Sequence, residues 1–181
     1  MGAPEGFAEF VTARSASLLR TAWLLTGDRG RAEDLVQDAL ARAWRAWPSV
    51  VARDRPEVYV RRVMVNVSIS WWRRRWRAEV STADVPDRAA LVDLTAQADV
   101  REAVRAALAT LPARQRAVVV LRYFEDLTEA QTAELLGCSV GTVKSQASRA
   151  LRRLKACPQL DGLVVGSAVV GAVDAADGGR S

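Results

Sequence analysis

The chain has 181 residues, of which half are apolar, and it carries a formal net charge of +5 with no histidine. The apolar share excludes a disordered chain, and the lack of histidine excludes a Ser-His-Asp triad and most zinc sites. Cys138 and Cys157 alone make neither a disulfide framework nor a structural zinc site, which fits a reducing cytoplasm.

Charge is distributed unevenly along the chain. Two basic stretches, 1–78 with net +6 and 100–157 with net +5, flank an acidic stretch at 79–99 with net −4, and the tail 158–181 has net −2. This alternation predicts two modules that face nucleic acid, joined by a linker with another role. The first ten residues lack a basic start followed by an apolar run, so no signal peptide is expected.

The first module begins with two predicted helices. Apolar residues recur at helical spacing over 7–25 and again over 28–47, and Gly27 between them fits a helix C-cap. Pro48 is expected to end the second helix and to open a loop that runs to Pro56.

The second helix has a polar outer face that its own stability does not explain. Asp38 and Arg42 form an i,i+4 pair worth only about a few tenths of a kcal/mol. Asp34 and Asp38 are like charges on the same face and cost a similar amount. A partner surface and a solvated face are equally good interpretations of this pattern.

A long helix is predicted over 57–77, with Pro56 at its N-terminus. An inward apolar strip, a polar strip and a second apolar strip run along it: Val60, Val63, Met64, Val67 and Trp71; Arg62, Asn66, Ser70, Arg73 and Arg77; and Val65, Ile69, Trp72 and Trp76. Such a helix either packs on two sides or presents aromatic side chains to a ligand. Tryptophan beside arginine suits unstacked bases, and burial in a core is the alternative for these tryptophans.

The linker and the start of the second module follow. Residues 79–98 are acidic, contain Pro86 and are interpreted as a linker. Helical spacing resumes over 99–111 and, after a proline, over 113–124. With the two helices described next, the second module is a four-helix unit.

The stretch 128–156 predicts a helix-turn-helix. Thr128 and Gln131 make a capping box, Gly137 fits the end of the first helix, and Ser139 is a good N-cap for the second. The apolar set is Ala130, Ala133, Leu135, Leu136, Val140, Val143, Ala147, Ala150, Leu151 and Leu154. The outer face of the second helix suits entry into a DNA major groove, although an amphipathic surface helix would show a similar pattern.

The tail after Pro158 holds an apolar run at 160–173. This run is too short and too rich in glycine for a membrane span. Packing on a domain, binding of a partner and loose order all remain open for the tail 158–181, whose role the sequence does not decide.

The chain resembles bacterial sigma factors of the extracytoplasmic-function class, and in particular the actinobacterial SigE-like branch, in three runs: AEDLVQDALARAWRAW, YVRRVMVNVSISWWRRRWR and LPARQRAVVVLRYFEDLTEAQTAELLGCSVGTVKSQASRALRRLK. The resemblance covers about residues 7–155. It implies an all-α fold of two small helical domains, sigma domain 2 at 7–78 and sigma domain 4 at 99–157, joined by the acidic linker 79–98.

The resemblance also implies partners and a function. These are core RNA polymerase, bound through its β′ clamp helices and β flap, and promoter DNA, with the chain directing initiation in the cytoplasm. It implies no enzymatic activity, no cofactor and no metal. An anti-sigma factor is a further candidate partner.

The resemblance assigns roles to three groups of residues. Those matching the clamp-binding helix are Asp34, Leu35, Gln37, Asp38, Arg42 and Trp44. Those matching the segment that reads and melts the −10 element are Arg61, Arg62, Asn66, Trp71, Trp72, Arg73 and Arg74. The loop 48–56 lies where the family captures a flipped base. Those matching −35 readout are Thr142, Lys144, Ser145, Gln146, Arg149 and Arg152, with glutamine at 146 where many relatives have arginine.

Two other classes of protein are alternatives. A stand-alone helix-turn-helix repressor would explain 128–156 but neither the polar face of the second helix nor the tryptophan-rich helix. A nucleic-acid enzyme would have only carboxylates to hold a metal, and Asp34 with Asp38 is the best pair for that chemistry.

Overall fold

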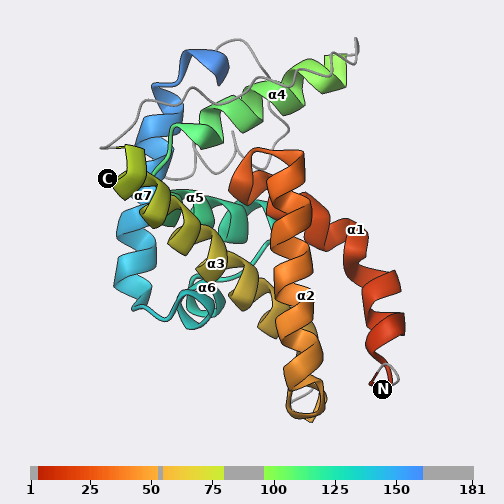
Figure 1. Ribbon diagram of the computed structural model, residues 1–181. Helices are drawn as coiled ribbons and strands as arrows, with labels where there is room; N and C mark the ends of the chain where they lie inside the picture. The colour runs from red at the N-terminus through yellow and green to blue at the C-terminus, as the bar shows by residue number, and fades with distance from the viewer. Residues whose placement is uncertain (1–3, 53–54, 80–95, 161–181) are drawn as a thin grey trace.

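The computed structural model describes residues 4–52, 55–79 and 96–160, and within these ranges every regular element is a helix. The all-α fold class is therefore confirmed for this part of the chain (Figure 1). Residues 80–95 of the expected linker and 161–181 of the expected tail lie outside the described residues, whereas residues 96–98, expected in the linker, begin α4. None of the described helices is long and apolar enough to cross a membrane.

Three helices form the first module, which was expected to be sigma domain 2 and is called domain 2 below: α1 (Phe7–Thr26), α2 (Arg29–Val51) and α3 (Pro56–Glu79). Gly27 ends α1 with φ 72°, as predicted, because glycine adopts this conformation without a Cβ clash. The next helix starts at once, since the Asp28 side chain accepts from the Arg31 N–H at 2.8 Å. The aromatic rings of Phe7 and Trp47 meet edge to face and tie α1 to the far end of α2.

The predicted end of the second helix at Pro48 is wrong. Helix α2 continues through this proline to Val51, and the Ala52 N–H donates to the Pro48 carbonyl at 3.2 Å. A proline so near a C-terminus removes one backbone hydrogen bond but leaves later carbonyls free to cap the helix. Burial of Val50, which is 4% exposed, offsets that loss. The loop to α3 is correspondingly shorter than expected.

The second module was expected to be sigma domain 4 and is called domain 4 below. It contains α4 (Ala96–Ala109), α5 (Ala113–Val119), a π-helical turn η1 (Val120–Phe124), α6 (Glu129–Leu136), α7 (Val140–Lys155) and a short 3-10 turn η2 (Pro158–Leu160). The predicted helix 113–124 exists, but its last turn is π-helical, and Glu125 N–H closes it on the Val120 carbonyl at 3.1 Å. Such turns often occur at functional sites. Here it brings Glu125 against domain 2.

The helix-turn-helix is confirmed in its caps. Thr128 and Gln131 form the reciprocal capping box, Gly137 ends α6 at φ 62°, and Ser139 accepts from the Thr142 N–H at 3.1 Å. Helix α7 buries the predicted stripe except for Val140, which is 39% exposed because it is the first helical residue and projects past the hydrophobic core. Ala130, in the first turn of α6, is exposed for the same reason.

The two modules pack against each other and share most of one hydrophobic core. Helix α3 lies against both α5 and α6, and α1 contacts α4, α5 and η1 (Figure 1). Val65 on the second apolar strip of α3 is fully buried, and Ile69 packs against the same core. Of the two interpretations of this helix, packing on two sides is therefore the one observed.

Candidate nucleic-acid interface

The outer face of α7 presents polar and basic groups to solvent. Lys144, Ser145, Arg149 and Arg152 are exposed, as expected for residues that reach DNA. Thr142 and Gln146 are half-buried because they lie on the side of α7 that faces α3. Lys144 is the only one of these basic groups in contact with a described carboxylate, Glu129, at 3.7 Å, and its side chain remains largely exposed.

The arginines at the start of α3 form ion pairs and hydrogen bonds with other residues of the chain. Arg61 is 17% exposed and lies between two carboxylates, with its Nη2 3.0 Å from Glu57 Oε1 and 2.5 Å from Glu125 Oε2. Arg62 Nη2 lies 3.3 Å from the carbonyl oxygen of Glu134 and 3.6 Å from its carboxylate. Two predicted −10 readers therefore contact domain 4.

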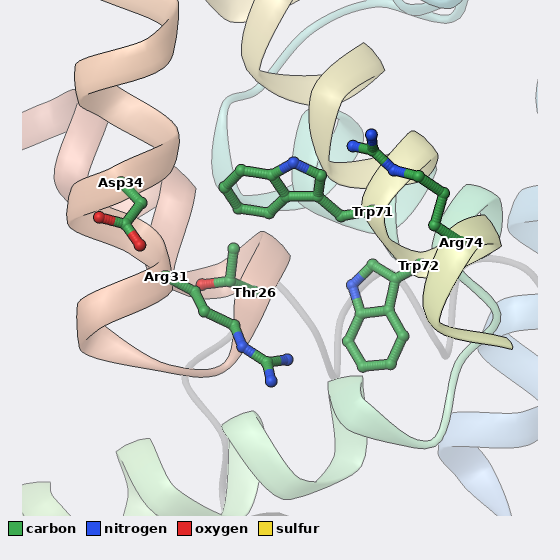
Figure 2. A pocket seen from close by; sticks show the side chains of 6 residues that line it. All are labelled: Thr26, Arg31, Asp34, Trp71, Trp72 and Arg74. Carbon is green, nitrogen blue, oxygen red and sulfur yellow. The ribbon is translucent and has the colours of Figure 1, made fainter. Parts of the chain in front are cut away.

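Asn66 and the C-terminal half of α3 are more open. Asn66, Arg73 and Arg74 are exposed, whereas Trp71 and Trp72 are half-buried. Both indoles line a pocket of about 370 Å³, together with Arg74 and, from α1 and α2, Thr26, Arg31 and Asp34 (Figure 2). Figure 2 shows Trp71 pointing from α3 toward α2, with Trp72 below it near domain 4. The side chains of Trp76 and Arg77 lie outside the described part.

Trp72 contacts Arg116, a residue that the sequence reasoning missed. The Arg116 guanidinium lies 4.4 Å from the Trp72 ring centroid, a cation–π contact between the two domains. The side chain is fully buried and donates to four carbonyl oxygens: Leu108 at 2.8 Å, Leu25 and Ala109 at 3.1 Å, and Leu111 at 3.2 Å. Burial lowers the pKa of Arg116 to about 10, so the group is charged at neutral pH.

A signal for Arg116 existed in the sequence. Arg116 lies three residues before Val119 and four before Val120, on the apolar stripe of its own helix. An arginine at such a position is buried only if its N–H groups have hydrogen-bond acceptors. Three of the acceptors are carbonyls in the last turns of α4 and α1, where the helix supplies few further N–H donors, and the fourth is the Leu111 carbonyl just after α4. Arg116 therefore closes two helix ends at once.

Glu125 and Glu134 are the other residues the sequence reasoning missed. The Glu125 side chain is 2% exposed, pairs with Arg61, and accepts from the Thr21 hydroxyl of α1 at 2.5 Å. Glu134 on α6 is about half exposed and contacts Arg62 and, at 3.3 Å, Arg55. Nothing in their local spacing distinguishes them from ordinary surface carboxylates.

The outer face of α2 is polar, as predicted, and forms a second candidate surface. Asp34, Gln37 and Arg42 are exposed and Asp38 is half-buried. The guanidinium of Arg42 holds Asp38 with two hydrogen bonds of 3.1 and 3.0 Å. Two of the assigned residues point elsewhere: Leu35 is fully buried in the core, and Trp44 packs edge to face on Phe7. Within the described ranges no three metal-ligating side chains come together.

Comparison with known proteins matches both modules. Residues 10–78 match the family model of Sigma-70 region 2, and residues 101–154 match that of Sigma-70, region 4. The RNA polymerase sigma-E factors of Streptomyces avermitilis and Streptomyces coelicolor are 42% and 41% identical, over 82% and 86% of this chain and 83% and 87% of theirs. The ECF RNA polymerase sigma factor SigL of Mycobacterium tuberculosis is 36% identical over 78% of this chain and 82% of its own.

Solved structures agree with these relatives. The sigma factor RpoE in complex with the anti-sigma factor NepR from Bartonella quintana aligns with a TM-score of 0.65 and 28% identity, over 87% of this chain and 99% of that one. CnrH in complex with the cytosolic domain of CnrY aligns with a TM-score of 0.61 over 86% of this chain and 89% of that one. At 24% identity, the second match shows the fold alone.

Proposed function

The chain belongs to the sigma-70 family, within its extracytoplasmic-function class, and from this premise we propose how its two modules divide the work of initiation. A sigma factor binds core RNA polymerase and directs promoter-specific transcription. The observation that carries this function is the order of the two matched regions along one chain, region 2 at 10–78 and region 4 at 101–154. A stand-alone repressor would need only the second of them.

Core polymerase binds the outer face of α2. Asp34, Gln37, Asp38 and Arg42 form a continuous polar patch that contributes little to the stability of the helix. Leu35 and Trp44 support this patch from beneath, since both are engaged in the domain 2 core. Acidic groups on such a patch suit a basic partner surface.

Domain 4 reads the −35 element with α7. The exposed Lys144, Ser145, Arg149 and Arg152 lie on the side of the helix away from its hydrophobic core. Arginine or lysine pairs with guanine edges in the major groove, and the same groups can contact phosphates. Thr142 and Gln146 join this surface when α7 faces DNA instead of α3.

Domain 2 reads and helps to melt the −10 element with α3. Arg61, Arg62, Asn66, Arg73 and Arg74 supply polar contacts, and Trp71 with Trp72 supplies indole rings for stacking on unpaired bases. The flipped base that the family captures at this loop is placed beside the connection between α2 and α3. This connection is shorter than the expected loop 48–56, because α2 extends to Val51.

An anti-sigma factor and a cytoplasmic location follow from the same premise. RpoE of Bartonella quintana, which shares this fold, was solved with an anti-sigma factor, and we assign a partner of that kind to this chain. Transcription initiation by core polymerase at chromosomal promoters takes place in the cytoplasm. No cofactor is assigned.

The test is reconstitution with core polymerase. The holoenzyme is incubated with fragments of its own genome, and unpaired thymines near the start site are mapped by permanganate reactivity beside a gel shift. Reactive thymines that depend on this protein support the function. Duplex binding by the protein alone, with no reactive thymine on any fragment, would instead favour a repressor.

A further inference from the structure

A pocket lies where the three helices of domain 2 meet. Its volume is about 370 Å³, and its lining comes from α1, α2 and α3: Thr26, Arg31, Asp34, Trp71, Trp72 and Arg74. Figure 2 shows Arg31 and Asp34 on the α2 side and the two indoles across from them on α3. Pockets of this size hold small molecules when a few polar groups converge on an aromatic wall.

The charged groups of this pocket are not used by ion pairs among the residues that the structure describes. Arg31 and Arg74 are exposed, and neither pairs with a described carboxylate, whereas Arg29 on the same surface of α2 pairs with Glu33 at 3.0 Å. Asp34 likewise pairs with no described cation. Guanidinium groups bind phosphate oxygens with planar, charge-assisted donors. The two arginines therefore favour a ligand that carries phosphates.

Trp71 supplies a flat apolar surface beside these cations. The indole is half-buried, points from α3 toward α2 (Figure 2) and packs against the hydrophobic core. An aromatic ring already fixed by core packing loses little conformational entropy when a second ring stacks on it. The Thr26 hydroxyl adds no free donor, because it donates to the Ala22 carbonyl at 2.8 Å. A fitting ligand thus joins a flat ring to an anionic group, as a nucleotide does.

Asp34 determines which end of a nucleotide faces it. A carboxylate repels phosphate and accepts hydrogen bonds, so the part of the ligand beside Asp34 has to carry N–H or O–H donors. Proteins often recognise an unpaired base by hydrogen bonds to its Watson–Crick edge. This edge has adjacent ring and amino N–H donors in guanine, whereas in adenine the ring nitrogen is an acceptor. A carboxylate at this position therefore favours guanine.

We propose that this pocket binds a free guanine nucleotide with two or more phosphates. Its base stacks on Trp71 beside Asp34, and its phosphates contact Arg31 and Arg74. The site goes beyond the sigma function and does not depend on it, since Thr26 and Arg31 belong to neither the polymerase-binding patch nor the −10 surface.

The test is equilibrium dialysis of the full chain, without polymerase, against radiolabelled GTP or ATP, with inorganic triphosphate and a single-stranded oligothymidine as competitors. Arg31→Gln and Arg74→Gln each remove one cation from the pocket. Arg29→Gln is the matched control, because it removes a cation from α2 outside the pocket. Asp34→Asn tests recognition of the base, with Glu33→Gln as its control. Circular dichroism checks the helix content of each variant.

GTP should bind with a dissociation constant below about 100 μM and about tenfold more tightly than ATP. Arg31→Gln and Arg74→Gln should each weaken GTP binding about tenfold, as expected for the loss of a charge-assisted hydrogen bond, while Arg29→Gln binds as wild type. Asp34→Asn should remove the preference for GTP over ATP, because the asparagine amide donates as well as accepts. Glu33→Gln should keep it.

A dissociation constant for GTP above about 1 mM would overturn the proposal. So would equal losses in Arg29→Gln and Arg31→Gln, which would show unspecific charge attraction, and so would competition by inorganic triphosphate as strong as that by unlabelled GTP. Binding of the oligothymidine that Arg31→Gln weakens, with no binding of GTP, would assign the pocket to a DNA strand instead. Promoter opening by the holoenzyme tests the sigma function separately, since the dialysis contains neither polymerase nor a promoter.

Discussion

Arg116→Met should destabilise the protein by about 3 kcal/mol. Loss of the guanidinium removes charged donors from four carbonyl oxygens, which costs about 6 kcal/mol at roughly 1.5 kcal/mol each. Removing the buried charge also removes the unfavourable free energy of its desolvation in the folded state, which offsets part of this loss. The lowering of its pKa from the ordinary arginine value to about 10 corresponds to about 3 kcal/mol of that cost. Methionine is flexible enough to fill the space without large strain.

The measurement is urea unfolding followed by circular dichroism, with Arg101→Met as the matched control. Arg101 lies exposed on α4, so its replacement should change the free energy of unfolding by less than about 0.5 kcal/mol. A loss below about 1 kcal/mol for Arg116→Met would refute the reasoning. It would mean that desolvation of the guanidinium cancels its hydrogen bonds, as happens for some buried ion pairs.

Three further predictions concern the proposed surfaces. Asp34→Arg with Asp38→Arg should weaken binding to core polymerase at least tenfold in a titration, whereas Glu9→Arg on α1 should not; equal affinities would remove the α2 patch from the interface. Arg149→Ala should cost about 1–3 kcal/mol at one −35 base pair, measured with a set of single-base promoter variants; a uniform loss would mark a phosphate contact instead. Asn66→Ala should reduce permanganate reactivity more than closed-complex binding, and an equal reduction in both would place melting elsewhere on domain 2.

Local signals in the sequence were sufficient to predict the helix caps and the turn of the helix-turn-helix. The caps at Thr128 and Ser139 and the positive φ at Gly137 depend on neighbours within three or four residues, and all three are present. Pro48 shows where local reasoning fails. Its penalty is real, but tertiary burial of Val50 outweighs it, and burial depends on residues far away in the sequence.

The contacts between the domains could not be predicted from spacing. Arg116 reaches the Leu25 carbonyl across 91 residues of sequence, and Glu125 reaches Thr21 across 104. The residues next to Arg116 and Glu125 in the sequence do not indicate which distant residues these two side chains contact. The roles assigned to the −10 and −35 readers also remain predictions, because they depend on contacts with DNA and polymerase that no spacing along the chain specifies.

The second apolar strip of α3 links the fold to the proposed function. Val65 is fully buried in the core that the two modules share, while Trp72, further along the same strip, is half-buried under Arg116. A helix that had to face only solvent before binding DNA would expose these apolar side chains, at a cost of about 25 cal/mol per Å². Docking of domain 4 removes that cost in the free chain. The same apolar and aromatic groups that suit contact with unpaired bases are therefore also groups that favour packing of α3 against domain 4.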